Sequence, residues 1–142
     1  KKYKTIHVAG TNGKGSTCAF LRAIGEAAGW RVHVFTSPHL VRFNERFRVA
    51  GEIVSDEMLN TTMAHIEAVN ANTPITLFEV ITAAAFQLFA AEPADLCVLE
   101  VGLGGRGDPR LIGSCRRRVH GPLLVSSGLC ARAADASGAS GR

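Results

Sequence analysis

The stretch Gly10-Thr11-Asn12-Gly13-Lys14-Gly15-Ser16-Thr17 decides how the rest of the chain is arranged. It follows an apolar run at residues 5–9 that predicts a buried strand. It precedes residues 16–28, whose apolar side chains recur every three or four positions, as on one face of a helix. A glycine-rich turn between a strand and a helix points backbone N–H groups at an anion, and the helix N-terminus adds positive partial charge. The stretch therefore predicts a loop that holds nucleotide phosphates.

In such a loop Lys14 contacts the β- and γ-phosphates, and the hydroxyl of Ser16 or Thr17 is offered to Mg²⁺. The spacing differs from the common G-x-x-x-x-G-K-[ST] pattern, because Gly15 stands between the lysine and the serine. An ordinary strand-to-helix turn that carries a surface lysine is the alternative interpretation. The position between a predicted strand and a predicted helix favours the phosphate loop.

Composition is that of one globular domain, since 142 residues with 46% hydrophobic side chains can bury a core. There is no run of 18 apolar residues to cross a membrane, and no apolar secretory segment follows the basic start, so a cytoplasmic protein is expected. The four cysteines are widely spaced, and Cys18 and Cys97 fall in the predicted helix and strand as small core residues.

The net charge of +4 is confined to the C-terminal part of the chain. Residues 1–106 carry ten basic and ten acidic side chains, whereas residues 107–142 carry six arginines and two aspartates. This tail is mostly Gly, Ala, Arg, Ser and Leu without a period, which favours disorder. A frameshift in GC-rich DNA is a second explanation. A basic tail can also bind phosphates, although nucleic acid is not the favoured partner.

Further along, strands are predicted at residues 31–36 and 95–101, with helices at 55–69 and from Thr76 to Pro93. The predicted inward-facing side chains are Met58, Leu59, Met63, Ile66 and Val69 in the first helix and Phe78, Ile81, Ala85, Leu88 and Phe89 in the second. Residues 37–51 show no period and predict a long functional loop. Alternating strands and helices indicate an α/β fold with a mostly parallel sheet flanked by helices, which binds ligands beyond the carboxyl ends of its strands.

Polar residues gather where those strands end. Glu100 closes the apolar strand at 95–101, and a carboxylate there must be paired or bound to a metal unless it faces water. Ser37-Pro38-His39 follows the strand at 31–36, with a hydroxyl and an imidazole. We expect the segment 37–51 to lie over the same face as Gly13 of the phosphate loop. Glu45 and Arg46 are interpreted as a structural ion pair.

The residues Thr76, Leu77, Phe78 and Glu79 have two interpretations. Threonine followed three positions later by glutamate forms a capping box, which is a sufficient structural reason for both. Phe78 is expected in the core, with stacking on a ligand ring as the alternative.

Four segments in order resemble the N-terminal ATPase domain of the bacterial folylpolyglutamate synthase/dihydrofolate synthase family, within the Mur-ligase superfamily. They are I-H-V-A-G-T-N-G-K-G-S-T, T-S-P-H-L-V-R-F-N-E-R, T-L-F-E and L-E-V-G-L-G-G-R, and the resemblance covers residues 5–106. It implies a truncated P-loop domain over residues 1–106, followed by the non-family tail 107–142. It also implies an enzyme that is a monomer when intact.

The resemblance implies a ligase that uses ATP and Mg²⁺ to join L-glutamate to dihydropteroate or to a folate through an acyl phosphate. It implies that Lys14 and Glu100 take part in catalysis. Its implied ligand sets are Thr11, Asn12, Gly13, Lys14, Gly15 and Ser16 for ATP, Ser16, Ser37 and Glu100 for the metal, and Thr76, Leu77, Phe78, Glu79 and Asp108 for the pterin.

After Asp108 the similarity stops, and a shifted reading of the following codons can restore the family's Ala-Thr-Asn. We therefore expect little ligase activity from this polypeptide, and an open apolar edge at its last strand. Two other functions remain possible. A muramyl-peptide ligase type of amide synthase shares the loop but should lack S-P-H-L-x-x-x-x-E-R. A phosphate-binding module whose basic tail contacts nucleic acid is the non-enzymatic alternative.

Overall fold

The structure is a computed structural model that describes residues 3–100 and 123–130. Within these residues the strands are β1 (Tyr3–Gly10), β2 (Val32–Phe35), β3 (Phe47–Val49), β4 (Glu52–Ile53), β5 (Leu96–Glu100) and β6 (Leu123–Cys130). The helices are α1 (Lys14–Ala27), α2 (Asp56–Asn70) and α3 (Leu77–Ala91), with a short 3-10 helix, η1 (Phe43–Arg46). None of these helices has the length and apolar character of a membrane span.

The strands form one sheet in the order β4-β3-β2-β5-β1-β6. The inner strands β2, β5 and β1 are parallel, while β6 and the β3–β4 hairpin pair antiparallel with their neighbours. The predicted α/β class is confirmed, but the sheet is mixed rather than mostly parallel. The parallel part can form a site, because it brings the carboxyl ends of β1, β2 and β5 together at one end of the sheet.

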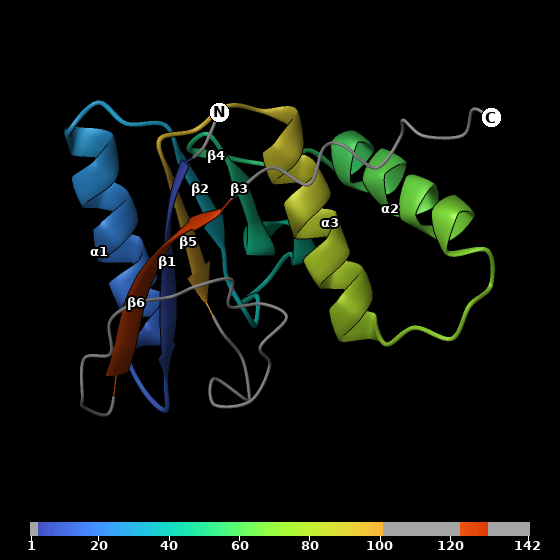
Figure 1. The fold of residues 1–142 in the computed structure, drawn as a ribbon, viewed down its shortest axis with the longest axis horizontal. Helices are drawn as coiled ribbons and strands as arrows, with labels where there is room; N and C mark the ends of the chain where they lie inside the picture. Colours follow the sequence, from blue (N-terminus) through green and yellow to red (C-terminus); the bar gives the residue numbers. More distant parts are fainter. Residues whose placement is uncertain (1–2, 101–122, 131–142) are drawn as a thin grey trace, which may run out of the picture.

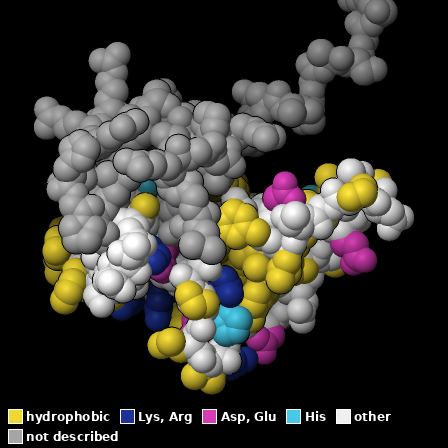
Figure 2. All heavy atoms as spheres, turned by 90° about the horizontal axis from the view of Figure 1, so that it is seen from below, with side chains coloured by type: hydrophobic (Ala, Val, Ile, Leu, Met, Phe, Trp, Pro, Cys, Tyr) yellow, Lys and Arg dark blue, Asp and Glu magenta, His cyan; other side chains and the backbone are white. Residues whose placement is uncertain are grey.

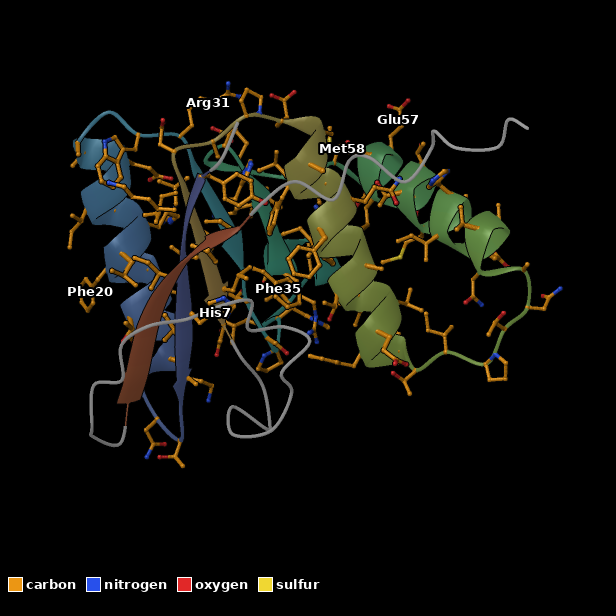
Figure 3. All side chains as sticks on the ribbon, viewed as in Figure 1. His7, Phe20, Arg31, Phe35, Glu57 and Met58 are labelled. Carbon is orange, nitrogen blue, oxygen red and sulfur yellow. The ribbon has the colours of Figure 1, made fainter. Side chains whose placement is uncertain are left out.

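Helices cover both faces of the sheet, with α1 on one side and α3 on the other, and α2 packs against α3 farther out (Figure 1). The core under α1 consists of Val8, Cys18, Val32, Val34, Leu96 and Val98. The larger core under α3 consists of Phe35, Phe47, Val54, Leu59, Ile81, Ala84, Ala85, Leu88, Phe89, Cys97 and Leu99. Figure 3 shows Phe35 pointing from β2 toward α3, and Phe20 pointing from α1 away from the sheet.

Helix α1 ends at the predicted glycine. Gly29 has a positive φ of 77°, and the Trp30 N–H donates to the Gly25 carbonyl oxygen over 3.0 Å. This is the Schellman arrangement, in which glycine supplies the left-handed residue after a helix. One turn earlier, α1 lies so close to the sheet that a Cβ atom at Gly25 would be 2.8 Å from Val32 Cγ2.

Helices α2 and α3 begin at the predicted caps. The Ser55 hydroxyl accepts from the Met58 N–H over 3.1 Å. Thr76 and Glu79 form the capping box, in which the Glu79 carboxylate accepts from the Thr76 N–H over 2.9 Å. These caps satisfy backbone donors that a helix N-terminus would otherwise leave unpaired.

Several expectations were wrong in detail. Residues 37–51 are not one long loop, because they include η1, β3 and the start of the turn to β4. On α2 only part of the predicted apolar side is covered, since Met58 is 48% and Val69 71% exposed. The helix packs mainly on α3, so its buried stripe is narrow. Phe78 is 49% exposed and is not a core residue.

The C-terminal expectations have mixed outcomes. Strand β5 is not an open edge, because it lies between β2 and β1. Residues 123–130, within the tail for which the sequence predicts no regular structure, form β6 and pair antiparallel along the whole of β1. The glycine run after Glu100, Asp108 and the site of the suggested frameshift lie outside the described residues.

Candidate nucleotide-binding site

The predicted phosphate loop lies between β1 and α1, as the sequence indicates. Gly13 precedes the helix in the left-handed region with a φ of 74°, a conformation that glycine adopts without strain. The helix begins at Lys14, two residues earlier than predicted, so the N–H groups of Lys14, Gly15 and Ser16 belong to its first turn. First-turn N–H groups have no acceptor within the helix, and they are therefore available to an anion.

Lys14 folds back over the loop, and its Nζ donates to the Gly10 carbonyl oxygen over 2.9 Å. The ammonium group is thus held at the mouth of the loop, where a phosphate would bind. Of the two candidate hydroxyls, Thr17 donates to the Gly13 carbonyl oxygen over 2.9 Å and is already engaged. Ser16 is exposed. The geometry therefore leaves Ser16 as the hydroxyl that is available to a ligand.

Glu100 is buried at the end of β5, with 7% of its surface exposed, so the water-facing alternative is excluded. Its Oε2 accepts from the Ser37 backbone N–H over 3.1 Å. This bond ties the end of β5 to the first residues after β2. Beside it, burial raises the pKa of Cys18 to about 12; the Glu100 carboxylate adds to the increase and Lys14 opposes it. The Cys18 thiol is therefore protonated at neutral pH.

A cleft of about 570 Å³ joins these parts. Its lining includes Gly15 of the phosphate loop, Ser37 and Leu40 of the segment after β2, and Glu100. Because Ser37 and Leu40 share this cleft with Gly15, the first part of segment 37–51 lies over the same face as the phosphate loop, as expected. The last part does not stay there, since β3 runs back along β2 and the Gly51 N–H donates to the carbonyl oxygen of Val32 at the opposite end of that strand. Seen from below, this end of the molecule shows basic side chains and a histidine gathered beside a broad apolar surface (Figure 2).

The predicted ion pair between Glu45 and Arg46 does not form in the described part of the chain. Instead, the Glu45 carboxylate accepts from the backbone N–H groups of Leu40 at 2.8 Å, Val41 at 3.2 Å and Arg42 at 2.9 Å. These donors, the Arg42 N–H most of all, lower the pKa of Glu45. The carboxylate therefore shapes the loop, and the adjacent arginine is left to a different set of partners.

Arg46 turns toward the residues that follow β2. Its Nη1 donates to Ser37 Oγ over 3.0 Å and its Nε donates to His39 Nδ1 over 2.9 Å. Its guanidinium carbon also lies 5.4 Å from the centre of the Phe43 ring. Sequence reasoning missed this network, because no local pattern indicates that the segment after β2 folds back and brings Arg46 to Ser37 and His39.

Of the predicted phosphate-loop residues only Gly15 lines the cleft, and Thr76 to Glu79 do not line it either. They form the N-terminus of α3, which lies at the same end of the molecule as the carboxyl ends of β1 and β5 (Figure 1). Leu77 is 72% exposed and Phe78 49%, so the N-terminus of α3 presents an apolar surface to solvent. Asp108, the other predicted pterin residue, lies outside the described residues.

The donors present suit a magnesium ion that also binds phosphate. No group of three His, Cys, Asp or Glu side chains gathers within the described residues, so they form no metal cage of that kind. Glu100 offers one carboxylate, and Ser37 and Ser16 offer hydroxyl oxygens. Mg²⁺ prefers oxygen ligands and is usually held by one or two carboxylates together with substrate phosphates and water.

No family model matches the chain. The dihydrofolate synthase/folylpolyglutamate synthase of Bacillus subtilis is 46% identical over 115 residues, which cover 76% of this chain and 27% of the relative. Its Escherichia coli counterpart is 48% identical over 101 residues, which cover 71% of this chain and 24% of the relative.

Solved structures give the same result. The bifunctional folylpolyglutamate synthase/dihydrofolate synthase of Yersinia pestis, complexed with AMPPNP and a manganese ion, is 47% identical with a TM-score of 0.66. The match covers 72% of this chain and 24% of that one. A second structure of such an enzyme, matched equally well, also has L-glutamate bound. Over about three quarters of its length, this chain is therefore a relative of the folylpolyglutamate and dihydrofolate synthases, and it spans about a quarter of their length.

Proposed function

We propose that this chain contains the ATP-phosphate-binding part of a ligase that joins L-glutamate to dihydropteroate or to a folate. The observation that carries the proposal is the single cleft shared by Gly15, Ser37 and Glu100 at the carboxyl ends of parallel strands. The names of the relatives supply the substrates, and the bound AMPPNP, manganese and glutamate of the solved structures agree with ATP and a divalent metal. A cytoplasmic location goes with this proposal.

The reaction that fits is a two-step amide synthesis. The γ-phosphoryl group of ATP passes to a substrate carboxylate, which gives ADP and an acyl phosphate. The amine of glutamate then attacks the acyl carbon, and the amide forms as phosphate leaves. Phosphoryl transfer depends on positioning and on neutralising negative charge more than on an acid or a base.

Each candidate residue has a role in this scheme. The loop from Thr11 to Ser16 binds the ATP phosphates through backbone N–H groups, and the Lys14 ammonium exchanges the Gly10 carbonyl for phosphate oxygens. Ser16, Ser37 and Glu100 would hold Mg²⁺, which would supply positive charge beside the transferred group. Residues 76–79 contribute an exposed apolar surface for the pterin.

The two other functions are less well supported. The muramyl-peptide ligase type is expected to lack the S-P-H-L-x-x-x-x-E-R segment, whereas here that segment contributes the cleft residues Ser37, Leu40 and Glu45. The nucleic-acid-binding alternative depends on the arginines of residues 107–142, none of which lies in the described part of the chain.

The proposal is tested by titrating the full chain with fluorescent ATP in Mg²⁺. Lys14→Ala removes a charge-assisted phosphate contact of about 1.5–3 kcal/mol, so we expect roughly a 10- to 150-fold higher Kd. Lys4→Ala is the matched control, because this exposed lysine lies at the other end of β1, over Trp30. An unchanged chain that binds no ATP, or a Lys14→Ala variant that binds as well as the control, would mean that the loop is not a nucleotide site.

A further inference from the structure

Arg46 makes an unusual set of contacts for a partly buried arginine. Its two side-chain hydrogen bonds go to a hydroxyl and an imidazole, Ser37 Oγ at 3.0 Å and His39 Nδ1 at 2.9 Å. The ion pairs among the described residues involve other arginines, namely Arg22, Arg31 and Arg42. A guanidinium held without a carboxylate forgoes the bidentate pairing that stabilises arginine best. Pairing with a carboxylate is therefore not the reason why Arg46 is held in this position.

The first partner, Ser37, is held from two sides. Its backbone N–H donates to Glu100 Oε2 over 3.1 Å, and its hydroxyl oxygen accepts from Arg46 Nη1. The first bond places Ser37 against the buried carboxylate. The second bond selects the direction of the hydroxyl, which could otherwise rotate among its rotamers. A serine oxygen has two lone pairs, so one remains after the arginine bond.

The backbone of Arg46 is anchored as firmly as its side chain. The Thr36 N–H donates to the Arg46 carbonyl oxygen over 3.0 Å, which joins the end of β2 to the end of η1. The loop between them is braced by the Glu45 carboxylate and its three N–H donors. The guanidinium therefore reaches Ser37 from a fixed base, which is what a residue that orients another must have.

We propose that Arg46 is the positioning residue of the metal site: it fixes the Ser37 hydroxyl so that the second lone pair of Oγ is presented to a divalent cation held with Glu100. This inference rests on the proposed function, because it assumes that nucleotide and metal bind at this cleft. It adds a residue that acts on the metal ligand through a hydrogen bond and touches neither metal nor nucleotide. Partners that orient metal ligands in this way typically contribute 10- to 100-fold to metal affinity.

The test measures two affinities on the full chain. Binding of Mn²⁺ in the presence of AMPPNP is followed by electron paramagnetic resonance, and binding of fluorescent ATP is followed in EDTA without metal. For Arg46→Gln we expect Mn²⁺ binding to weaken by 10- to 100-fold, while metal-free nucleotide binding stays that of the unchanged chain. Arg46→Lys keeps the positive charge but not the planar guanidinium with its several N–H donors, so it should recover part of the lost Mn²⁺ affinity.

Two controls make the result specific. Arg42→Gln removes an exposed arginine of the same loop, paired with Asp56, and should leave both affinities unchanged. In a Ser37→Ala background, Arg46→Gln should weaken Mn²⁺ binding no further, since the oxygen that it orients is gone. Circular dichroism checks that each variant is folded. If Arg46→Gln does not fold, the Mn²⁺ affinity of Arg46→Lys is the measurement that tests the proposal.

The outcomes separate this inference from the proposed function. An unchanged chain that binds no nucleotide would overturn both. A chain that binds nucleotide and Mn²⁺ while the Arg46 variants match Arg42→Gln would overturn the inference alone. Weaker binding of metal-free ATP by the Arg46 variants would also overturn it, because the arginine would then contact phosphate directly.

Discussion

At the scale of single residues, His33 shows how a buried side chain can be required in one protonation state. It is fully buried in β2, where its Nδ1 accepts from the Ala50 N–H over 3.0 Å and its Nε2 lies 3.1 Å from the Glu92 carbonyl oxygen. A backbone N–H can only donate, so Nδ1 carries no proton and Nε2 carries one. The ring stacks on Phe89 at 4.8 Å between centroids, which fixes its plane.

This arrangement predicts a loss of stability in mild acid. Burial lowers the pKa of His33 from 6.5, so the unfolded chain binds a proton at a higher pH than the folded chain does. Stability is therefore fully present above about pH 6.5 and is lost as the pH falls below it. We expect the urea midpoint to fall between pH 7.5 and pH 5.5 and this dependence to become shallower in His33→Phe. Burial also lowers the pKa of His7, so part of the slope should remain.

The control for this prediction is His65→Phe, which changes an exposed histidine on α2. It should leave the pH dependence as it is. Identical slopes for His33→Phe and the unchanged chain would show that His33 is not held neutral by the fold. The variant is expected to be less stable at every pH, because Ala50 N–H and Glu92 C=O lose their partner. The decisive measurement is therefore how steeply the urea midpoint changes with pH, and not the value of the midpoint at any one pH.

At the scale of elements, the close packing of α1 on the sheet makes a second prediction. A Cβ atom at Gly25 would lie 2.8 Å from Val32 Cγ2 and 3.4 Å from Leu96 Cδ2, and Val32 is fully buried. Gly25→Ala gains about 1 kcal/mol of helix propensity, but overpacking of a well-packed core typically costs about 1–3 kcal/mol. The β-branched valine cannot rotate away easily, so we expect net destabilisation.

The same substitution at Gly15 is the matched control. Gly15 lies in the first turn of the same helix, and a Cβ atom there would meet nothing within 4 Å. Denaturant unfolding should show Gly15→Ala at least as stable as the unchanged chain and Gly25→Ala less stable. If the two variants have equal stability, the helix is free to move away from the sheet and the close approach is not a constraint.

Elements with local signals could be predicted from the sequence, and those without them could not. Gly29, Ser55 and the Thr76–Glu79 box mark helix ends through short-range hydrogen bonds, and each helix end lies where they predict. The β3–β4 hairpin was missed because its turn is Ala50-Gly51, with φ angles of 51° and 98°. Such two-residue turns usually carry Asn-Gly or Asp-Gly, since alanine is strained at positive φ.

That turn is stabilised by partners far away in sequence, which no local pattern reveals. The Ala50 N–H donates to His33, and the Gly51 N–H donates to the Val32 carbonyl oxygen over 2.9 Å. The nearby Arg48 adds a local bond to the Gly51 carbonyl oxygen over 2.9 Å. The same limit applies to the site. The phosphate loop and buried Glu100 could be predicted from strand ends, whereas the partner of Arg46 depends on how the segment after β2 folds back.

At the scale of the whole molecule, the chain order of the sheet explains why the cleft forms. The connection from β1 to β2 runs through α1 on one face, and the connection from β2 to β5 runs through α2 and α3 on the other. Strand β5 then inserts between β2 and β1. The ends of all three parallel strands thus meet where the two crossovers diverge, which is where α/β sheets bind ligands.

A further prediction concerns turnover. The 142-residue chain should bind ATP but show no glutamate-dependent formation of ADP, because amide synthesis needs ATP, a carboxylate and an amine held together. Such positioning contributes about 7–11 kcal/mol of the barrier, and the matched part corresponds to about a quarter of the relatives. An assay with dihydropteroate, tetrahydrofolate and L-glutamate measures it. Steady turnover by the isolated chain would contradict this expectation.

A chimera shows whether the matched segment is itself competent. In this protein, residues 3–100 replace the corresponding segment of the Escherichia coli relative, which is 48% identical over the matched region. If the cleft of Gly15, Ser37 and Glu100 is a working phosphate site, the chimera should form ADP and the glutamate adduct in equal amounts. The same chimera with Lys14→Ala should lose activity, since it lacks the loop ammonium. A folded chimera that binds ATP without turnover, while the intact relative is active in the same assay, would show that this segment no longer supports the chemistry.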